Sequence, residues 1–177
     1  MTTRVKRLTA ARLLNSADAL GDLLVDTVRG GSSLGFMESL DRATAADWWR
    51  GLSTAVESGR LALWAARDAQ GIVGTVGVQF ADKPNGRHRA EIIKLMVHRR
   101  ARGQGLGRTL LTTAEHGAAD AGVTLLHLDT ETDSPAEGLY RSAGWEWAGT
   151  IPDYATDPYG IPHATTLFYK RTVPIAA

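Results

Sequence analysis

Three glycines, Gly103, Gly105 and Gly107, stand two residues apart, directly after a basic run of the chain. Glycine has no Cβ, so the backbone N–H groups of such a loop can approach a ligand closely. The apolar residues that follow recur at helical spacing, which predicts a helix over residues 104–121. The first N–H groups of a helix have no partner inside it and, together with the helix dipole, attract anions. The pattern therefore predicts a site for a diphosphate.

Two familiar glycine motifs do not fit this loop. A P-loop ends in Gly-Lys-Ser/Thr, whereas Gly107 is followed by Arg108 and Thr109. The dinucleotide fingerprint needs Gly-x-Gly-x-x-Gly, which the even spacing of the three glycines does not supply. A tight turn between a strand and a helix, with no ligand, stays open as the alternative.

Two carboxylates are candidates for acid–base chemistry, Glu91 on a predicted strand over residues 90–97 and Asp129 on a predicted strand over residues 125–131. A carboxylate that is partly buried between such strands has a raised pKa, which suits it to accept a proton near neutral pH. We therefore expect one or both of these groups to act as a general base.

A metal site and a serine hydrolase are both disfavoured. His127, Asp129 and Glu131 alternate along one strand and so share a face, but alternate residues of a strand lie about 6.6 Å apart, too wide for a compact tetrahedral site. We expect no metal. The chain contains no Gly-x-Ser-x-Gly sequence, so a nucleophilic serine at a strand-to-helix turn is not indicated.

The segments that must position these residues differ in the spacing of their apolar residues. Some have the two-residue spacing of a strand and others the spacing of about 3.6 residues of a helix. Turn residues make residues 60–97 an antiparallel meander, and the strand over 125–131 should run parallel to 90–97 after a right-handed crossover. The whole order predicts a mixed α/β layer. Helices are expected over residues 10–29, 44–57 (with Thr44 as N-cap), 104–121 and 135–143. Strands are expected over residues 4–8, 60–67, 72–80, 90–97, 125–131, 145–151 and 164–171, with a turn-rich loop over 152–162.

A glycine-rich loop over residues 30–37 carries three apolar side chains, Leu34, Phe36 and Met37. Loops normally keep such groups out of water, so they either tuck under the neighbouring helices or line a pocket. The sequence leaves both readings open. Trp48 and Trp49 on the predicted second helix are expected in the core.

Composition sets the broad class. A chain of 177 residues favours a single domain over residues 1–177, large enough to bury about 70% of its unfolded surface. The net charge of +1 implies no general attraction to nucleic acid or membrane, and we expect neither as a partner. The absence of cysteine excludes disulfides and is compatible with a reducing compartment. No signal peptide or apolar run of spanning length is visible, so we expect a cytoplasmic protein.

The segment Arg102-Gly103-Gln104-Gly105-Leu106-Gly107 resembles the Arg/Gln-x-x-Gly-x-Gly/Ala signature of the GNAT superfamily of N-acetyltransferases. The resemblance implies the GNAT fold, a mostly antiparallel seven-stranded sheet with about four helices and a splayed central strand pair, here 90–97 and 125–131. It implies acetyl-CoA as co-substrate, with its pyrophosphate on the loop amides and its pantetheine arm along the first of these strands. The implied cofactor-binding residues are Leu95, Met96, Val97, Arg102, Gly103, Gln104, Gly105, Leu106, Gly107, Arg108, Ser134 and Tyr140.

The segment from Ser134 to Trp145 is similar to a second GNAT segment, in which many members place a tyrosine near the coenzyme sulfur. That resemblance implies that Tyr140 is the acid that protonates the leaving thiolate. A helix tyrosine with its ring in the core is the alternative.

Segments 30–37, 83–86, 94–97 and 125–131 resemble the tabtoxin-resistance acetyltransferases of the same superfamily. This likeness implies a small antibiotic- or toxin-type amine as acceptor, with Glu91 and Asp129 as base candidates and Leu34, Phe36 and Met37 near the substrate. An acetyltransferase of a protein N-terminus or lysine and a non-catalytic CoA-binding module remain alternatives. Monomer and homodimer are both open.

Overall fold

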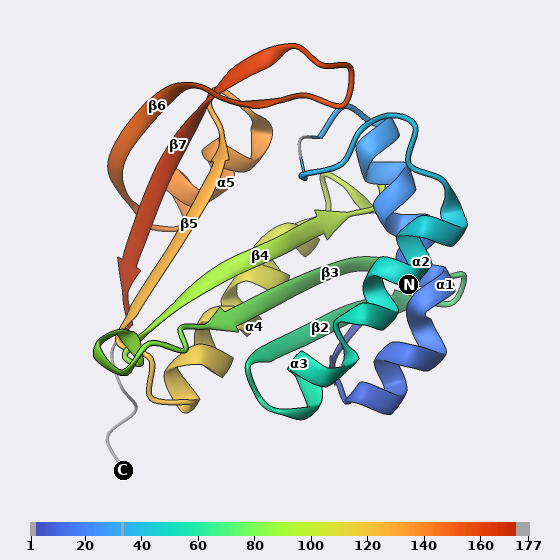
Figure 1. The fold of residues 1–177 in the computed structure, drawn as a ribbon, viewed down its shortest axis with the longest axis horizontal. Helices are drawn as coiled ribbons and strands as arrows, with labels where there is room; N and C mark the ends of the chain where they lie inside the picture. The colour runs from blue at the N-terminus through green and yellow to red at the C-terminus, as the bar shows by residue number, and fades with distance from the viewer. Residues whose placement is uncertain (1–2, 33, 173–177) are drawn as a thin grey trace.

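The computed structural model describes residues 3–32 and 34–172, so Ser33 of the predicted 30–37 loop lies outside the described residues. All its strands form one seven-stranded sheet in the order β1-β2-β3-β4-β5-β7-β6 (Figure 1). Only β4 and β5 pair in parallel, and the remaining neighbours are antiparallel. The predicted mixed sheet and its meander are therefore confirmed. The strands are β1 (Arg4–Leu8), β2 (Leu61–Asp68), β3 (Gly71–Phe80), β4 (Arg89–Val97), β5 (Leu125–Glu131), β6 (Glu146–Thr156) and β7 (Pro162–Arg171).

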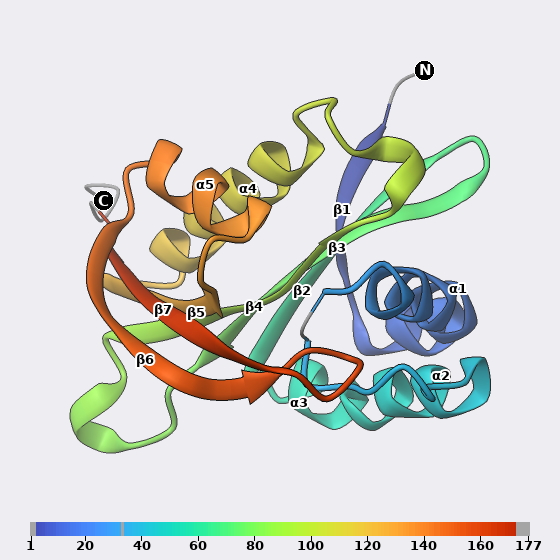
Figure 2. The same ribbon diagram turned by 90° about the horizontal axis from the view of Figure 1, so that it is seen from above.

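Helices cover both faces of the sheet (Figure 2). One face carries α1 (Ala10–Arg29), α2 (Arg42–Gly51) and α3 (Ser53–Glu57), and the other carries α4 (Leu106–Asp120) and α5 (Pro135–Ser142). Each layer has its own apolar core, and the predicted stripe of α4 is buried in one of them. In the described part of the chain no helix is both long and apolar enough to cross a membrane.

The predicted helix over residues 44–57 begins earlier than expected and is interrupted. Thr44 is not the N-cap, because Asp41 caps α2 by accepting hydrogen bonds from Thr44 N at 2.8 Å and Thr44 Oγ1 at 3.0 Å. A carboxylate also interacts favourably with the positive end of the helix dipole. The helix ends at Gly51, and a separate short helix follows Leu52, so the predicted single helix is two helices in the described part of the chain. Trp49 is fully buried, as predicted for the core, and Trp48 is partly buried against it.

The predicted loop over residues 152–162 is also wrong, because β6 and β7 are longer than their hydrophobic patterns suggest. Both strands continue to a tip of only five residues, 157–161. Asp153 has φ +49°, and the register shifts between Ile151 and Ala155, so a bulge carries the strand past Pro152. Proline is tolerated here because β6 is an edge strand, where a missing N–H costs no ladder bond.

The two central strands separate after a short paired region. Their Cα partners run only from Arg89 and Leu125 to Glu91 and His127, and β4 and β5 diverge beyond this point (Figure 1). Lys94 has φ +50° where the register between β3 and β4 shifts, which places a bulge in β4 within the unpaired part. The predicted splayed pair is therefore confirmed.

Candidate functional site

The glycine loop lies between β4 and α4, at the end of β4 that has left β5. Gly103 and Gly105 have φ +73° and +76°, a backbone conformation that favours glycine, and a Cβ at either position would meet no atom within 4 Å. A Cβ at Gly107 would instead contact Leu139 of α5 at 3.4 Å. The first two glycines thus leave open space beside the N-terminus of α4, which can hold an anion, while α5 lies beside the third.

The arginines of the basic run do not surround this space as a group. Arg99 forms an ion pair with Asp26 of α1, and Arg100 forms one with Asp68 at the end of β2. They attach the turn before the loop to the body of the protein, so attraction for an anion must come chiefly from the backbone N–H groups.

Side chains of the loop itself fix its shape. Arg102 donates from Nε to Val97 O at 3.0 Å, and Gln104 donates from Nε2 to Arg100 O at 3.2 Å. Arg108 donates to Ser142 of α5, to its carbonyl oxygen at 3.0 Å and to its hydroxyl at 2.6 Å. The loop is therefore held open by its own side chains, which favours binding because little order has to be gained.

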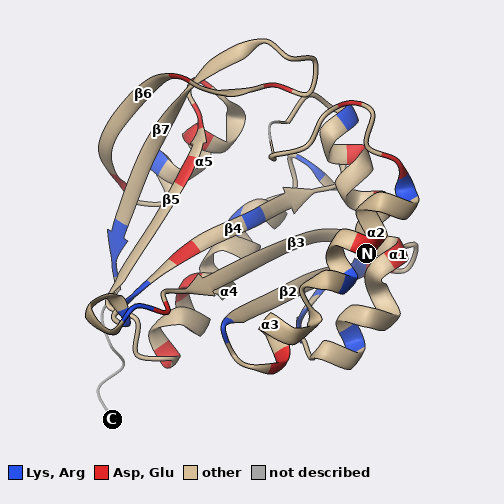
Figure 3. Ribbon diagram, viewed as in Figure 1, with Lys and Arg blue, Asp and Glu red and all other residues tan. Residues whose placement is uncertain are grey.

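Glu91 and Asp129 lie on the same face of the sheet, on either side of the point where β4 and β5 part. Glu91 is the Cα partner of His127, and Asp129 follows two residues further along β5. Burial raises the pKa of Glu91, and the nearby negative charge of Asp129 raises it further, while His127 and Lys94 oppose this. Figure 3 shows the acidic positions on both strands. The structure thus brings the two predicted base candidates together.

Tyr140 projects from α5 into the core beside β5. Its side chain is 6% exposed. Its ring packs edge-on against Trp145, with 5.9 Å between ring centroids, and at a tilt against Phe168, with 6.2 Å between centroids. Burial raises its pKa, and the charge of Asp129 adds to this effect. Within the described residues its hydroxyl makes no hydrogen bond, yet it is not among the fully enclosed unpaired atoms. The ring is therefore a core ring, as one reading expected, while the hydroxyl stays accessible and protonated.

The apolar loop after α1 is anchored by a residue that sequence reasoning passed over. Lys94, on the bulge of β4, donates from Nζ to Leu34 O at 2.7 Å. Its ammonium lies 5.4 Å from the ring centre of Phe36 and 5.2 Å from that of Trp48. Burial lowers its pKa. A single lysine within the apolar run of β4 was the signal in the sequence, but only the fold shows what it contacts.

The first reading of the 30–37 loop, in which its apolar side chains tuck under the neighbouring helices, holds for two of the three. Leu34 and Phe36 pack against the core of the α1–α3 layer, whereas Met37 is 48% exposed. The tip of the β6–β7 hairpin closes over this loop, with Glu38 N donating to Pro158 O at 2.9 Å (Figure 1). Tyr159 extends the contact by donating to Arg29 O at 3.5 Å. The hairpin and the loop therefore bridge the space above the separated strands.

Metal-binding clusters of three or more His, Asp or Glu side chains do not occur among the residues that the structure describes. His163 Nδ1 lies 3.9 Å from Glu131 Oε1, and His163 Nε2 lies 3.3 Å from Asp157 Oδ2 at the hairpin tip. These groups join the hairpin to β5. They extend the polar face on which Glu91 and Asp129 lie.

Comparison with known proteins gives one family. Residues 30–145 match the model of the Acetyltransferase (GNAT) family. Human N-acetyltransferase 8B is 36% identical over 88 residues, a match that covers 49% of this chain and only 39% of that protein. The chain thus spans well under half the length of the curated relatives it matches.

Solved structures show the same fold. A ribosomal-protein-alanine N-acetyltransferase from Brucella melitensis superposes with a TM-score of 0.77 at 25% identity, covering 95% of this chain and 99% of that one. A phosphinothricin acetyltransferase from Sinorhizobium meliloti, in complex with AcCoA, gives a TM-score of 0.77 at 19% identity, with 97% and 89% covered. The predicted fold class is confirmed, and the narrower likeness to the tabtoxin-resistance group is not.

Proposed function

Since this chain belongs to the acetyltransferase (GNAT) family, we propose that it transfers the acetyl group of acetyl-CoA to the amine of a small molecule. The observation that carries the proposal is the open space at Gly103 and Gly105, at the start of α4 and beside two strands that part at Glu91. When bound, acetyl-CoA supplies an activated thioester. The backbone N–H groups of residues 102–108 would hold its pyrophosphate, and the unpaired edge of β4 from Leu95 to Val97 would receive the pantetheine arm.

Three side chains supply the proton transfers. The acceptor arrives as an ammonium and loses a proton, through water, to Glu91, which has Asp129 beside it. The raised pKa of Glu91 suits this step. The free amine then attacks the thioester carbonyl and forms a C–N bond. The nitrogen loses its second surplus proton to solvent, the C–S bond breaks, and Glu91 returns its proton to solvent. Tyr140 gives its proton to the departing thiolate and regains one from solvent. The raised pKa of Tyr140 keeps the phenol protonated until that moment.

A small acceptor is supported by the contact between the hairpin and the loop after α1. The hydrogen bond from Glu38 N to Pro158 O bridges the acceptor side, which leaves less room for a continuous polypeptide than an open groove would. Leu34, Phe36 and Met37 lie on the loop that this contact holds, and they would line the acceptor site. We propose an antibiotic- or toxin-type amine and a resistance role. The absence of cysteine agrees with the cytoplasm as its location.

A protein N-terminus is the second candidate acceptor, and one observation favours it. The Brucella melitensis protein is named a ribosomal-protein-alanine N-acetyltransferase. It is 25% identical to this chain across nearly all of both chains. In that case the hairpin would have to move away from the loop after α1 to admit a peptide.

A thiol-release assay distinguishes these functions. The protein is incubated with acetyl-CoA and separate panels of amino-acid-like amines, aminoglycosides and peptides with free N-termini, and products are identified by mass. Turnover of small amines with little turnover of peptides supports the proposal, whereas turnover of peptides alone establishes the second candidate. Binding of acetyl-CoA without thiol release in any panel would leave a non-catalytic CoA-binding module.

A further inference from the structure

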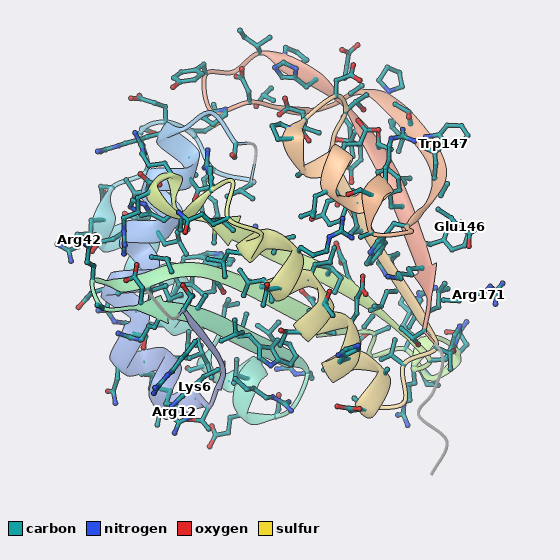
Figure 4. All side chains as sticks on the ribbon, turned by 180° about the vertical axis from the view of Figure 1, so that it is seen from behind. Lys6, Arg12, Arg42, Glu146, Trp147 and Arg171 are labelled. Carbon is teal, nitrogen blue, oxygen red and sulfur yellow. The ribbon has the colours of Figure 1, made fainter. Side chains whose placement is uncertain are left out.

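A cavity with a volume of about 560 Å³ opens at the β1 edge of the sheet, away from the separated strands. Its walls come from β1, the first turns of α1 and the end of β2. Figure 4 shows Lys6 and Arg12 together at this edge. Its volume falls within the range of about 300–1,000 Å³ that is typical of small-molecule sites. The lining residues are Arg4, Lys6, Leu8, Arg12, Ser16, Ala65, Arg67 and Asp68.

The side chains that line this cavity are mostly positively charged. Four basic side chains line it, and Asp68 is the one acidic residue among its lining residues. Asp68 is already bound by the guanidinium of Arg100, with Nη2 donating to Oδ1 at 3.1 Å. That contact lowers the pKa of Asp68, so the carboxylate stays charged and stays committed to Arg100. It therefore offsets little of the positive charge in the cavity.

The basic side chains have few partners of their own. Arg67 donates from Nη2 to Ser16 Oγ at 3.1 Å, which is a neutral acceptor. Across residues 3–32 and 34–172, no ion pair involves Arg4, Lys6 or Arg12. The cavity is thus lined by guanidinium and ammonium groups that have no carboxylate partner among the described residues.

The register of the sheet makes this arrangement unfavourable without a counter-charge. Arg4 and Arg67 are Cα partners on β1 and β2, and like charges directly opposite each other destabilise a strand pair. Charges on an edge strand can guard it against pairing with another chain, which would account for Arg4 and Lys6. It does not account for Arg12 on α1 and Arg67 on β2, which approach the same cavity from other elements.

We propose that this cavity binds a small, multiply charged oxyanion, a molecule that carries at least two phosphate or carboxylate groups. Guanidinium groups match such oxygens with paired hydrogen bonds, and the compact ammonium of Lys6 adds a point charge. Asp68 forms one wall of the cavity, and its ion pair with Arg100 joins this wall to the turn before the glycine loop. The site is separate from the acetyl-transfer site and does not depend on the proposed acceptor.

The test is calorimetric titration of the protein with inorganic pyrophosphate and, separately, with citrate. Acetyl-CoA is kept at saturation so that the glycine loop is occupied, and the salt concentration is low. We expect one site per chain, an affinity that falls as salt is added, and a dissociation constant at least roughly tenfold higher in Arg4→Gln/Arg12→Gln. A preference between the two probes identifies the oxyanion. The matched control is Lys83→Gln/Arg87→Gln, which loses the same charge on the exposed turn between β3 and β4 and should bind as the unaltered protein does.

Chemical-shift mapping on the unaltered protein provides a measurement that does not depend on a variant folding. Pyrophosphate should shift the amides of Ser16 and Ala65 and leave the loop over residues 102–108 unchanged under saturating acetyl-CoA. The proposal is overturned if neither anion binds, if the control loses as much affinity as Arg4→Gln/Arg12→Gln, or if the shifts fall elsewhere. Tighter binding of a single-stranded oligonucleotide than of either small anion would also overturn it.

Discussion

Replacing Tyr140 by phenylalanine removes one oxygen atom and tests the assignment of the acid. The ring keeps its packing against Trp145 and Phe168, because neither contact involves the hydroxyl. Since that hydroxyl makes no hydrogen bond within the described residues, the substitution removes none. The free energy of unfolding should therefore change by less than about 1 kcal/mol, or about 2–4 °C in Tm for a chain of this size.

The expected kinetic effect is much larger than the effect on stability. A positioned acid contributes about 10²–10⁴-fold to the rate. This range corresponds to about 3–5 kcal/mol of transition-state stabilisation. We expect kcat to fall roughly 100-fold, and by at least about tenfold, in Tyr140→Phe. Because burial raises the pKa of Tyr140, the phenol remains protonated across the neutral range, and loss of activity from its ionisation should occur only above the pH at which an ordinary tyrosine ionises.

The assay is steady-state thiol release, with acetyl-CoA affinity from calorimetry and Tm from thermal unfolding. Tyr169→Phe is the matched control, since it removes the same atom from β7, where the hydroxyl donates to Glu146 at 2.6 Å. Unchanged kcat in Tyr140→Phe would mean that the thiolate leaves unaided or takes its proton from solvent. Loss of acetyl-CoA affinity together with kcat would mean that the hydroxyl holds the coenzyme. Only a loss of kcat at constant affinity supports the acid.

Four further substitutions test other parts of the site. Gly105→Val should weaken acetyl-CoA binding at least about tenfold in calorimetry, because the new side chain fills the space beside α4. The control Gly59→Val, with a similar φ of +72° and equal room, should lower stability without changing this affinity. Equal affinities in the two variants would show that the pyrophosphate does not bind at this loop. Burial raises the pKa of Glu91, so its base form is lost as pH falls through that raised value, and the acidic limb of the kcat/KM profile should lie above the ordinary glutamate pKa of about 4.3. Glu91→Gln and Asp129→Asn should each lower kcat/KM and alter that limb, and an unaltered profile in both would exclude them as the base. Lys94→Met should raise the acceptor KM roughly tenfold, because the loop loses the hydrogen bond to Leu34 O, while acetyl-CoA affinity stays constant; an unchanged acceptor KM would show that the loop does not shape the acceptor site.

The sequence alone determined the order and type of almost every element. Hydrophobic periodicity and turn residues are local signals, so α1 was predicted over the residues that it occupies, and β1 and β5 likewise. The sequence also predicted a glycine loop ahead of an amphipathic helix, because the glycines and the apolar spacing that follows them are local signals. The positive φ of Gly103 and Gly105 came from the structure. Errors arose where a tertiary contact or a bulge overrides the local pattern, as at the Asp41 cap and in the strand that continues through Asp153.

Only the tertiary structure decided which polar groups lie close together. Glu91 and Asp129 are 38 positions apart in the printed sequence, and they meet because β4 and β5 pair for a few residues and then diverge. Lys94 lies in an apolar strand, and a bulge in that strand accompanies its contact with the loop after α1. The basic cavity depends on the register that sets Arg4 opposite Arg67 and on α1 packing beside them. Strand register and helix packing depend on which faces of distant segments are buried against one another. A short stretch of neighbouring residues therefore does not determine them.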